Sequence, residues 1–380
     1  MKDGPIRQLV MVLAWLSFIA VPSRAQQPTA PTPAVPVDPI RAIVDAFGSH
    51  SVVALSEGTH GNEQGLAFLL SLIRDPRFAA RVNDIVLEGP NARYQDVMDR
   101  YVRGETVPVD LLRRVWDDTT QQQANGPMWT GDVPDTYRAV RQLNASLPPE
   151  RKLRILLGDP PIDWDKVQTK GEPARWIALR DTFPAELIER EVLAKHRRAV
   201  VVFGNMHFQR KQMLANYESA GEGPIATVVS ALELSGSRTK VFSIWTATDA
   251  ELSDLQQDVS AWRVPSLAVL RGSVLGAADF SRYFPPEYSP MAATRFAIRD
   301  GQLVPISRDE WRSLKMEDQF DAVLYLGPRS AIRVAPRRPL PPERCADPEF
   351  LPMRLARLAL TGLPPIEAER LKQLCAQPAK

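Results

Sequence analysis

Cysteine is scarce in this chain of 380 residues, which contains only Cys345 and Cys375. Two cysteines are too few for a zinc site built from thiolates, so a bound metal would have to be held by histidines and carboxylates. Both cysteines lie near the C-terminus. If the chain enters an oxidising compartment, we expect them to form a disulfide that closes residues 346–374.

Long hydrophobic runs are also missing. The apolar run near the N-terminus, Leu9–Val21, has 13 residues, whereas a membrane-spanning helix needs about 20. Lys2 and Arg7 precede this run and small residues up to Ala25 follow it, which is the layout of a cleavable secretory signal. We therefore expect residues 1–25 to be removed near Ala25 and the protein to be exported, to the periplasm or the medium, without a membrane anchor.

The sequence has no excess of charge of either sign. Residues 1–25 hold three of the 47 basic and one of the 45 acidic side chains, so the remainder is balanced at 44 of each. Binding to nucleic acid or to an anionic membrane surface depends on concentrated positive charge. We therefore expect no nucleic-acid partner and no membrane partner, and a small-molecule substrate instead.

Proline is concentrated at the two ends of the chain. Residues 26–39 contain five prolines and few large apolar side chains, which indicates an extended linker that does not pack into a core. Residues 40–335 have the composition of a folded domain. We expect the proline-rich residues 336–380 to form a C-terminal appendage with two short helices separated by Pro364 and Pro365.

Apolar stretches typical of strands alternate with helical patterns through the domain. The expected strands are Val52–Leu55, Ile85–Leu87, Leu153–Leu157, Ala199–Phe203, Ile225–Val229, Lys240–Trp245 and Ala322–Leu326. The clearest expected helices run from about Asn62 to Arg74, with Leu66, Leu69, Leu70 and Ile73 on one face, and from a cap at Asn91 to Gly104. Continuous apolar strands bounded by amphipathic helices indicate a mostly parallel sheet covered on both faces. The expected fold class is α/β, with a helical insertion between the second and fourth strands.

Polar residues follow four of these strands. The strand ends read Glu57-Gly58-Thr59-His60, Glu88-Gly89, Gly158-Asp159 and Gly204-Asn205-Met206-His207. In open parallel sheets, ligands bind beyond the carboxyl ends of the strands, so we expect the glutamates and histidines of the first, second and fourth strand ends to form one site. These four residues are Glu57, His60, Glu88 and His207. We expect Thr59, Asn205 and Asp159 to contact the substrate or to support this site.

The other two histidines provide a contrast. His50 and His196 precede their strands, so they would lie at the opposite edge of the sheet, as ordinary loop residues. The insertion between the second and fourth strands holds four tryptophans, Trp116, Trp129, Trp164 and Trp176. These side chains could line an apolar substrate pocket or could simply pack the insertion.

Several segments of the sequence resemble the erythromycin esterase family, within a wider group that includes ChaN-like haem-binding lipoproteins and TIKI-type metalloproteases. The segments are SEGTHGNEQG, IVLEGPNARYQDVMDRYVRGE, MWTGDVPDTYRAVRQLN leading to LLGD, and VVVFGNMHF, which span roughly residues 50–330. The match places Trp129 and Asp159 among the family's supporting positions. It implies an α/β enzyme that cleaves an ester or lactone.

The resemblance also implies roles for the individual residues. Glu57 and His60 match the family's Gly-Glu-x-Thr-His-Gly motif, Glu88 matches its second-strand glutamate, and His207 matches the last histidine of its His-Asn-x-His segment. Gly204 stands where that segment has its first histidine. Ser56 likewise stands where the first motif has the Gly that precedes its glutamate.

The residues themselves suggest a hydrolytic mechanism without a cofactor. A histidine near its ordinary pKa is well suited to accept a proton from water, provided that a carboxylate fixes its tautomer. Glu57 can do this for His60, which would activate water to attack an ester or lactone carbonyl. His207 would polarise or protonate the reacting oxygen, and Glu88 would hold the water or a histidine. The chain has no Gly-x-Ser-x-Gly motif, so a serine triad is not supported.

Two alternative functions use the same residues. Glu57, His60, Glu88 and His207 could together bind Zn²⁺ or Mn²⁺ in a metal-dependent hydrolase or protease, with Asp159 as a further ligand or a supporting residue. A non-enzymatic protein could instead bind haem or another small ligand, with His60 or His207 as the axial ligand.

Overall fold

The computed structural model describes residues 30–120, 122, 133–210, 226–236, 239–255, 257–283, 295–299, 302–334, 340, 342–361 and 365–376. Residues 31–380 belong to one compact unit. The predicted signal peptide over residues 1–25 and the predicted site residue Trp129 lie outside the described residues.

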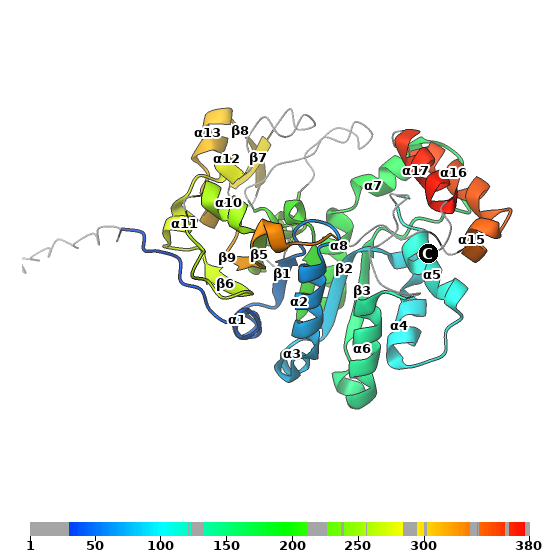
Figure 1. Cartoon of the computed structure of the whole chain (residues 1–380), viewed down its shortest axis with the longest axis horizontal. Coiled ribbons are helices and arrows are strands. Elements are labelled where there is room, and N and C mark those ends of the chain that lie inside the picture. The colour runs from blue at the N-terminus through cyan, green and yellow to red at the C-terminus, as the bar shows by residue number, and fades with distance from the viewer. Residues whose placement is uncertain are drawn as a thin grey trace, which may run out of the picture. The chain divides into compact units, whose positions relative to one another are not determined.

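A seven-stranded sheet forms the centre of the domain (Figure 1). Its strands are β1 (Val52–Ser56), β2 (Asp84–Asn91), β3 (Arg154–Asp159), β4 (Ala199–Phe203), β5 (Val241–Ala247), β6 (Ser266–Val269) and β9 (Ala322–Tyr325). The order is β3-β2-β4-β1-β5-β9-β6, and only β6 runs antiparallel to its neighbour. Because β4 lies between β2 and β1, the strand ends with Glu57, Glu88 and His207 are neighbours, and the end of β3 with Asp159 lies next to that of β2.

Helices cover both faces of this sheet (Figure 1). One face packs against α1 (Pro39–Ala46), α2 (Glu63–Arg74), α3 (Pro76–Arg81), α4 (Gln95–Arg103), α5 (Val109–Asp117) and α6 (Asp135–Ser146). The other packs against α8 (Thr182–Ile188), α9 (Val228–Leu234), α10 (Asp249–Asp254), α11 (Val274–Ala277), α12 (Phe280–Tyr283) and α14 (Met316–Gln319). Along β1, Val52 contributes to one apolar layer and Val53 to the other, as the alternation of side chains along a strand requires. The predicted α/β fold is confirmed.

Shorter elements connect these layers. They are η1 (Ala92–Tyr94), η2 (Pro149–Arg151), α7 (Gly171–Ala178), η3 (Glu189–Leu193), η4 (Asn205–Phe208), α13 (Arg308–Ser313), η6 (Arg329–Ala331) and the antiparallel hairpin of β7 (Arg295–Arg299) and β8 (Gln302–Ile306). Neither this hairpin nor the edge strand β6 was expected from the sequence. These strands have only four or five residues each, and a short apolar run such as Leu267–Leu270 does not distinguish a strand from another buried element.

Six of the seven expected strands are present, but the strand expected at Ile225–Val229 is wrong. Residues from Val228 onward form the helix α9. The side chain of Thr227 caps this helix by accepting the N–H of Ser230 at 3.1 Å. A short apolar run fits a strand and the start of a buried helix equally well, and here the threonine cap decides for the helix.

The predicted helix after β1 is present, but its buried face is shifted. Asn62 caps α2 by accepting the N–H of Gly65 at 3.0 Å. The side chains that α2 buries are Phe68, Leu69, Leu72 and Ile73. Leu66 and Leu70, expected on this face, are only half-buried. The helix has apolar residues on two overlapping faces, and the sheet covers the one that contains the larger Phe68. The second predicted helix ends at Gly104 as expected, with a φ of 107°.

The proline-rich segment before the domain packs more closely than expected. Ala34 is buried in the core, and the backbone of Val37 pairs with that of Leu267 in β6 through hydrogen bonds of 2.8 and 3.1 Å. Thr32 pairs similarly with residues 272–274. The described part of this segment is therefore not a free linker, because its backbone pairs with Leu267 of the edge strand and with the loop that follows.

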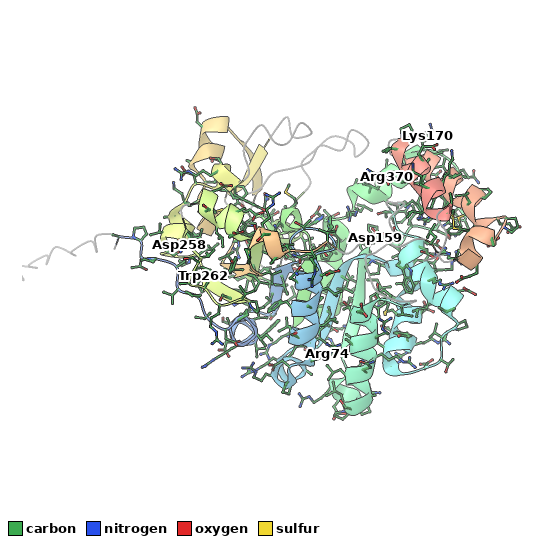
Figure 2. All side chains as sticks on the ribbon, viewed as in Figure 1. Arg74, Asp159, Lys170, Asp258, Trp262 and Arg370 are labelled. Carbon is green, nitrogen blue, oxygen red and sulfur yellow. A yellow bond between two sulfur atoms is a disulfide. The ribbon has the colours of Figure 1, made fainter. Side chains whose placement is uncertain are left out.

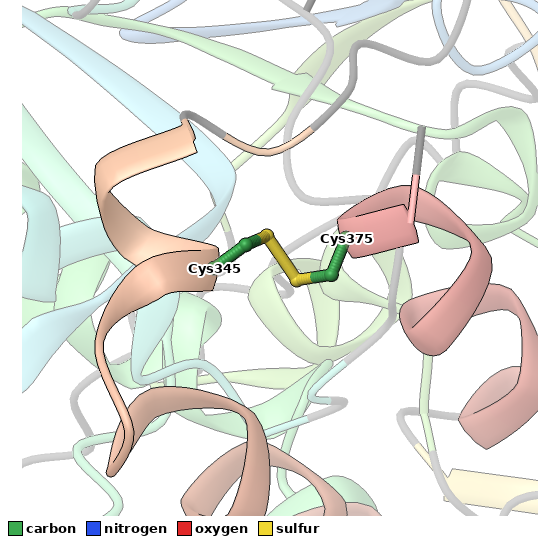
Figure 3. Close-up of a disulfide and its surroundings, with 2 residues drawn as sticks. All are labelled: Cys345 and Cys375. Atoms are coloured by element: carbon green, nitrogen blue, oxygen red, sulfur yellow. A yellow bond between two sulfur atoms is a disulfide. The ribbon is translucent and has the colours of Figure 1, made fainter. Parts of the chain in front are cut away.

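The C-terminal residues contain three helices, α15 (Pro342–Ala346), α16 (Phe350–Thr361) and α17 (Pro365–Ala376). The predicted disulfide between Cys345 and Cys375 is confirmed and joins α15 to α17 (Figure 3). Leucines of α16 and α17 form a small separate apolar cluster. Among the described helices, none combines the length and the hydrophobicity needed to cross a membrane.

Candidate active site

Glu57 and His60 lie in the turn between β1 and α2. Gly58 and Gly61 have φ values of 74° and 80°, a left-handed conformation that glycine adopts without strain and that reverses the chain here. Glu57 Oε1 lies 2.5 Å from His60 Nδ1. Glu57 therefore accepts the Nδ1 proton, and Nε2 is left as the basic nitrogen of a largely exposed ring.

Glu88 lies in β2, where the pairing with β3 becomes irregular. Its Oε2 accepts the N–H of Gly204 at 3.0 Å. Its Oε1 accepts a hydrogen bond from Arg180 and lies 3.3 Å from His207 Nε2. Three donors around one largely buried carboxylate fix its orientation and stabilise its charge.

His207 lies in η4, directly after β4. Its Nδ1 lies 2.8 Å from Asp181 Oδ1, while its Nε2 faces Glu88. Asp181 is itself held by the N–H of Val228 at the start of α9, at 3.1 Å. Both nitrogens of the largely buried imidazole therefore meet a carboxylate, which favours the protonated ring.

The three side chains converge on Gly204. A Cβ atom at this position would lie 3.5 Å from His60 Cε1, 3.8 Å from Glu88 Oε2 and 3.8 Å from His207 Cδ2. The two imidazoles thus border the same small space. The structure brings Glu57, His60, Glu88 and His207 together, whereas their chemical roles remain predictions.

Asp159 supports this cluster from the end of β3 (Figure 2). Its carboxylate accepts two hydrogen bonds from Thr120, 2.8 Å from the backbone nitrogen and 2.6 Å from the hydroxyl. Arg180 Nε lies 3.7 Å from Asp159 Oδ1, while the other end of the guanidinium reaches Glu88. Asp159 therefore acts on the cluster through Arg180, as a supporting residue.

The remaining predicted residues are placed differently. Asn205 binds the hydroxyl of Tyr283 at 3.0 Å, at the rim of the cluster. The side chain of Thr59 is exposed. Among the tryptophans, Trp116 is buried in the core and Trp164 donates to the carbonyl of Thr119 at 3.0 Å, so packing is the better description for these two.

Arg180 and Asp181 complete the site, and sequence reasoning missed both. They lie in the connection between α7 and α8, not at a strand end. The only local signal is an adjacent pair of opposite charges, which is common on protein surfaces. Their contribution depends on the packing of α8 and α9 beneath η4, which no local pattern predicts.

His50 and His196 lie at the opposite edge, as predicted. His50 stands two residues before β1 and contacts Phe242, with ring centroids 5.4 Å apart. His196 is exposed in the turn before β4 and has a φ of 52°. Since the strands are parallel, both histidines are a full strand length from the cluster.

Solved structures with a similar arrangement of elements were found. One is a Bacillus cereus protein, with 12% sequence identity, a TM-score of 0.44, and coverage of 78% of this chain and 95% of that chain. Another is described as a succinoglycan biosynthesis protein, with 11% identity, a TM-score of 0.47, and coverage of 78% and 94%. No protein-family profile and no curated protein matches the sequence.

The electrostatics distinguish the two histidines. Burial lowers the pKa of His207, but the charges of Asp181 and Glu88 outweigh it and raise the pKa to about 10. The hydrogen bond to Glu57 raises the pKa of His60 above 6.5, against the effect of its partial burial. His207 is therefore cationic at neutral pH, and Glu57 favours the protonated form of His60.

The carboxyl groups are distinguished in the same way. Burial would raise the pKa of Glu88, but His207 and Arg180 hold it well below its ordinary value. For Asp159, burial dominates and raises the pKa to about 7, although Arg180 and the hydrogen bonds from Thr120 oppose the shift. Glu88 is thus a permanent anion beside the cationic His207.

Part of the cluster has the donor set of a metal site. One ligand atom each from Glu57, His60 and Glu88 lies within 4.8 Å of the others. One imidazole and two carboxylates suit Zn²⁺ or Mn²⁺. His207 does not complete this set, because both of its ring nitrogens face carboxylates.

Proposed function

We propose that this chain is an exported hydrolase of the erythromycin esterase-like type, in which water activated by His60 attacks the carbonyl of an ester or lactone in a small molecule. The proposal rests on one observation: two histidines with different environments border the same space. His60 Nδ1 is held by Glu57, and Cε1 of the same ring, which is bonded to both ring nitrogens, borders the same position next to Gly204 as Cδ2 of His207 does.

The two histidines would have complementary roles. His60 would act as the general base, since its Nε2 is left to accept a proton and its partner Glu57 stabilises the imidazolium that forms. The cationic His207 lies beside the reacting space and would stabilise negative charge on the carbonyl oxygen by its own charge, because both of its ring nitrogens already face carboxylates. Glu88, fixed by Gly204 and Arg180, would orient the water. No serine or cysteine nucleophile is needed.

A panel of aliphatic esters and lactones tests this proposal with wild-type protein and His60→Ala. A general base typically contributes about 10²- to 10⁴-fold to the rate, and we expect His60→Ala to lose that much of kcat. The exposed ring contributes little to packing, so the melting temperature should barely change. His196→Asn is the matched control, because asparagine tolerates the positive φ of that exposed position. Full activity in His60→Ala would refute the proposal.

A metal-dependent hydrolase is the second candidate, and the close approach of Glu57, His60 and Glu88 favours it. These residues would hold the ion, which would supply an acidified water molecule as the nucleophile. Metal analysis of protein purified without added metal, followed by chelation and restoration with Zn²⁺ or Mn²⁺, separates the candidates. Activity that chelation leaves unchanged would exclude the metal mechanism.

A further inference from the structure

Three arginines join the C-terminal helices to the catalytic domain. Arg354 donates to the carbonyl of Asp117 at 2.6 Å and to Gln122 Oε1 at 2.9 Å. Arg357 forms an ion pair of 2.5 Å with Asp118, and Arg344 forms one of 2.6 Å with Asp117. All of these contacts fall at the end of α5 and on the short segment that follows it.

Such contacts fix geometry more than they add stability. Arg354 is only 6% exposed, and the cost of removing charges from water offsets most of the attraction in a buried pair. A planar guanidinium that binds a carbonyl and a side-chain oxygen at once nevertheless allows one orientation of the segment. The C-terminal helices therefore hold residues 117–120 in one position.

The restrained segment leads directly to the active site. The carbonyl of Asp118 accepts a hydrogen bond from Asn91 at 2.6 Å, at the end of the strand that carries Glu88. Two residues further on, Thr120 binds both oxygens of Asp159. Asp159 in turn lies beside Arg180, which donates to Glu88. A continuous series of polar contacts thus connects the arginines of α16 to the cluster.

A second route leads from α16 to Arg180. Helix α16 contacts α7, which ends at Ala178, two residues before Arg180. The guanidinium of Arg357 also lies 5.5 Å from the ring centroid of Trp164, whose nitrogen donates to the carbonyl of Thr119. Both routes position Arg180, the residue that joins Asp159 to Glu88.

We propose that Arg354 and Arg357 are positioning residues of the active site, which hold Arg180 against Glu88 through residues 117–120 and Asp159. The disulfide between Cys345 and Cys375 keeps α16 in place for this purpose. The C-terminal helices are therefore a working part of the enzyme although they touch no reacting atom. This inference rests on the proposed hydrolase function.

The test compares Arg357→Ala, Arg357→Lys and a control in the same helix pair. Arg370→Ala is the control, because Arg370 lies in α17 (Figure 2) and pairs with Glu367 within that helix. Misplacement of a catalytic group by about 1 Å costs up to 10²-fold, so we expect kcat of Arg357→Ala to fall at least about tenfold per folded molecule, with KM unchanged. Arg357→Lys keeps the charge opposite Asp118 and should recover part of the loss, and Arg370→Ala should match wild type.

A double-mutant cycle distinguishes positioning from a general loss of structure. Thr120→Val removes the hydroxyl contact with Asp159, and combined with Arg357→Ala it should cost no more than the worse single change, since both act along one route. Fully additive losses, or a loss that only follows the unfolded fraction, would overturn the proposal. If Arg357→Ala does not fold, Arg357→Lys takes its place in the double-mutant cycle.

Amide hydrogen exchange gives a readout that needs no substrate. The Thr120 N–H donates to Asp159, so its exchange should accelerate in Arg357→Ala and after reduction of the disulfide, but not in Arg370→Ala. Unchanged exchange at Thr120 would overturn the positioning role even if no ester is hydrolysed. A wild-type protein without hydrolytic activity but with the expected exchange pattern would refute the proposed function alone, leaving the restraint of residues 117–120 intact.

Discussion

Gly204→Ala tests the space between the two histidines with a single methyl group. The new Cβ would lie 3.5 Å from His60 Cε1 and 3.8 Å from both Glu88 Oε2 and His207 Cδ2. These are ordinary van der Waals separations. The backbone at Gly204 has φ −64° and ψ 155°, which alanine adopts without strain. The methyl group therefore fits the folded protein but occupies the position where the attacking water would stand.

The expected effects on stability and activity have opposite signs. Replacing glycine by alanine at a compatible backbone position stabilises a protein by about 0.4–1 kcal/mol, because the unfolded chain loses freedom. The same methyl group should displace the water from between His60 and Glu88. The rate should then fall by about 10²-fold or more, as for loss of the general base itself.

Two measurements on the same protein check this expectation. Urea unfolding should give a midpoint equal to or above that of wild type. The kcat/KM for the best ester should fall by about 10²-fold or more. Gly89→Ala is the matched control, because a Cβ there meets no atom within 4 Å, and it should leave the activity unchanged. A Gly204→Ala variant with wild-type kcat/KM would show that no reacting atom occupies this space.

The titrating groups give two further predictions. His60 must be neutral to accept a proton, and Glu57 raises its pKa above 6.5. We therefore expect kcat/KM to rise with pH through that pKa and to fall again near pH 10, where His207 loses its proton. Glu57→Gln should move the acidic limb of this profile to lower pH, and an acidic limb that does not move would contradict the role of His60. Burial raises the pKa of Asp159 to about 7, so the folded protein binds this proton more tightly than the unfolded chain, and stability is lost as the pH rises from about 4 to about 7. Between pH 5 and pH 8, the unfolding free energy of Asp159→Asn should therefore fall less than that of wild type, and the difference should be up to about 3 kcal/mol. The unfolding free energies are measured by urea titration at each pH, and an equal pH dependence in the two proteins would rule this out.

The strand ends were predictable because they depend on local signals. Runs such as Ala199–Phe203 mark buried strands, and parallel strands necessarily bring their carboxyl ends to one edge. Local patterns alone therefore suffice to group Glu57, Glu88 and His207. They do not specify the strand order, which sets β4 between β1 and β2 and makes these ends immediate neighbours.

Residues supplied by connections between helices escaped prediction. Arg180 and Asp181 reach the site because α8 packs against α9 and the sheet, and their partners are far away in sequence. The exchange of a strand for α9 has a different origin, since Val228 and Val229 satisfy either pattern and only the local cap at Thr227 separates them. Long-range packing therefore placed Arg180 and Asp181, whereas a local helix cap decided between a strand and α9.

The pairing of residues 32–37 with β6 and the loop after it has a consequence for the behaviour of the protein in concentrated solution. A strand at the end of a sheet exposes unpaired N–H and C=O groups and can recruit the same strand of another molecule into an intermolecular sheet. Here both backbone groups of Val37 are bonded to Leu267, so this segment covers the edge of β6. A version of the protein that begins at Asp38 should self-associate, whereas one that begins at Ala30 should stay dispersed.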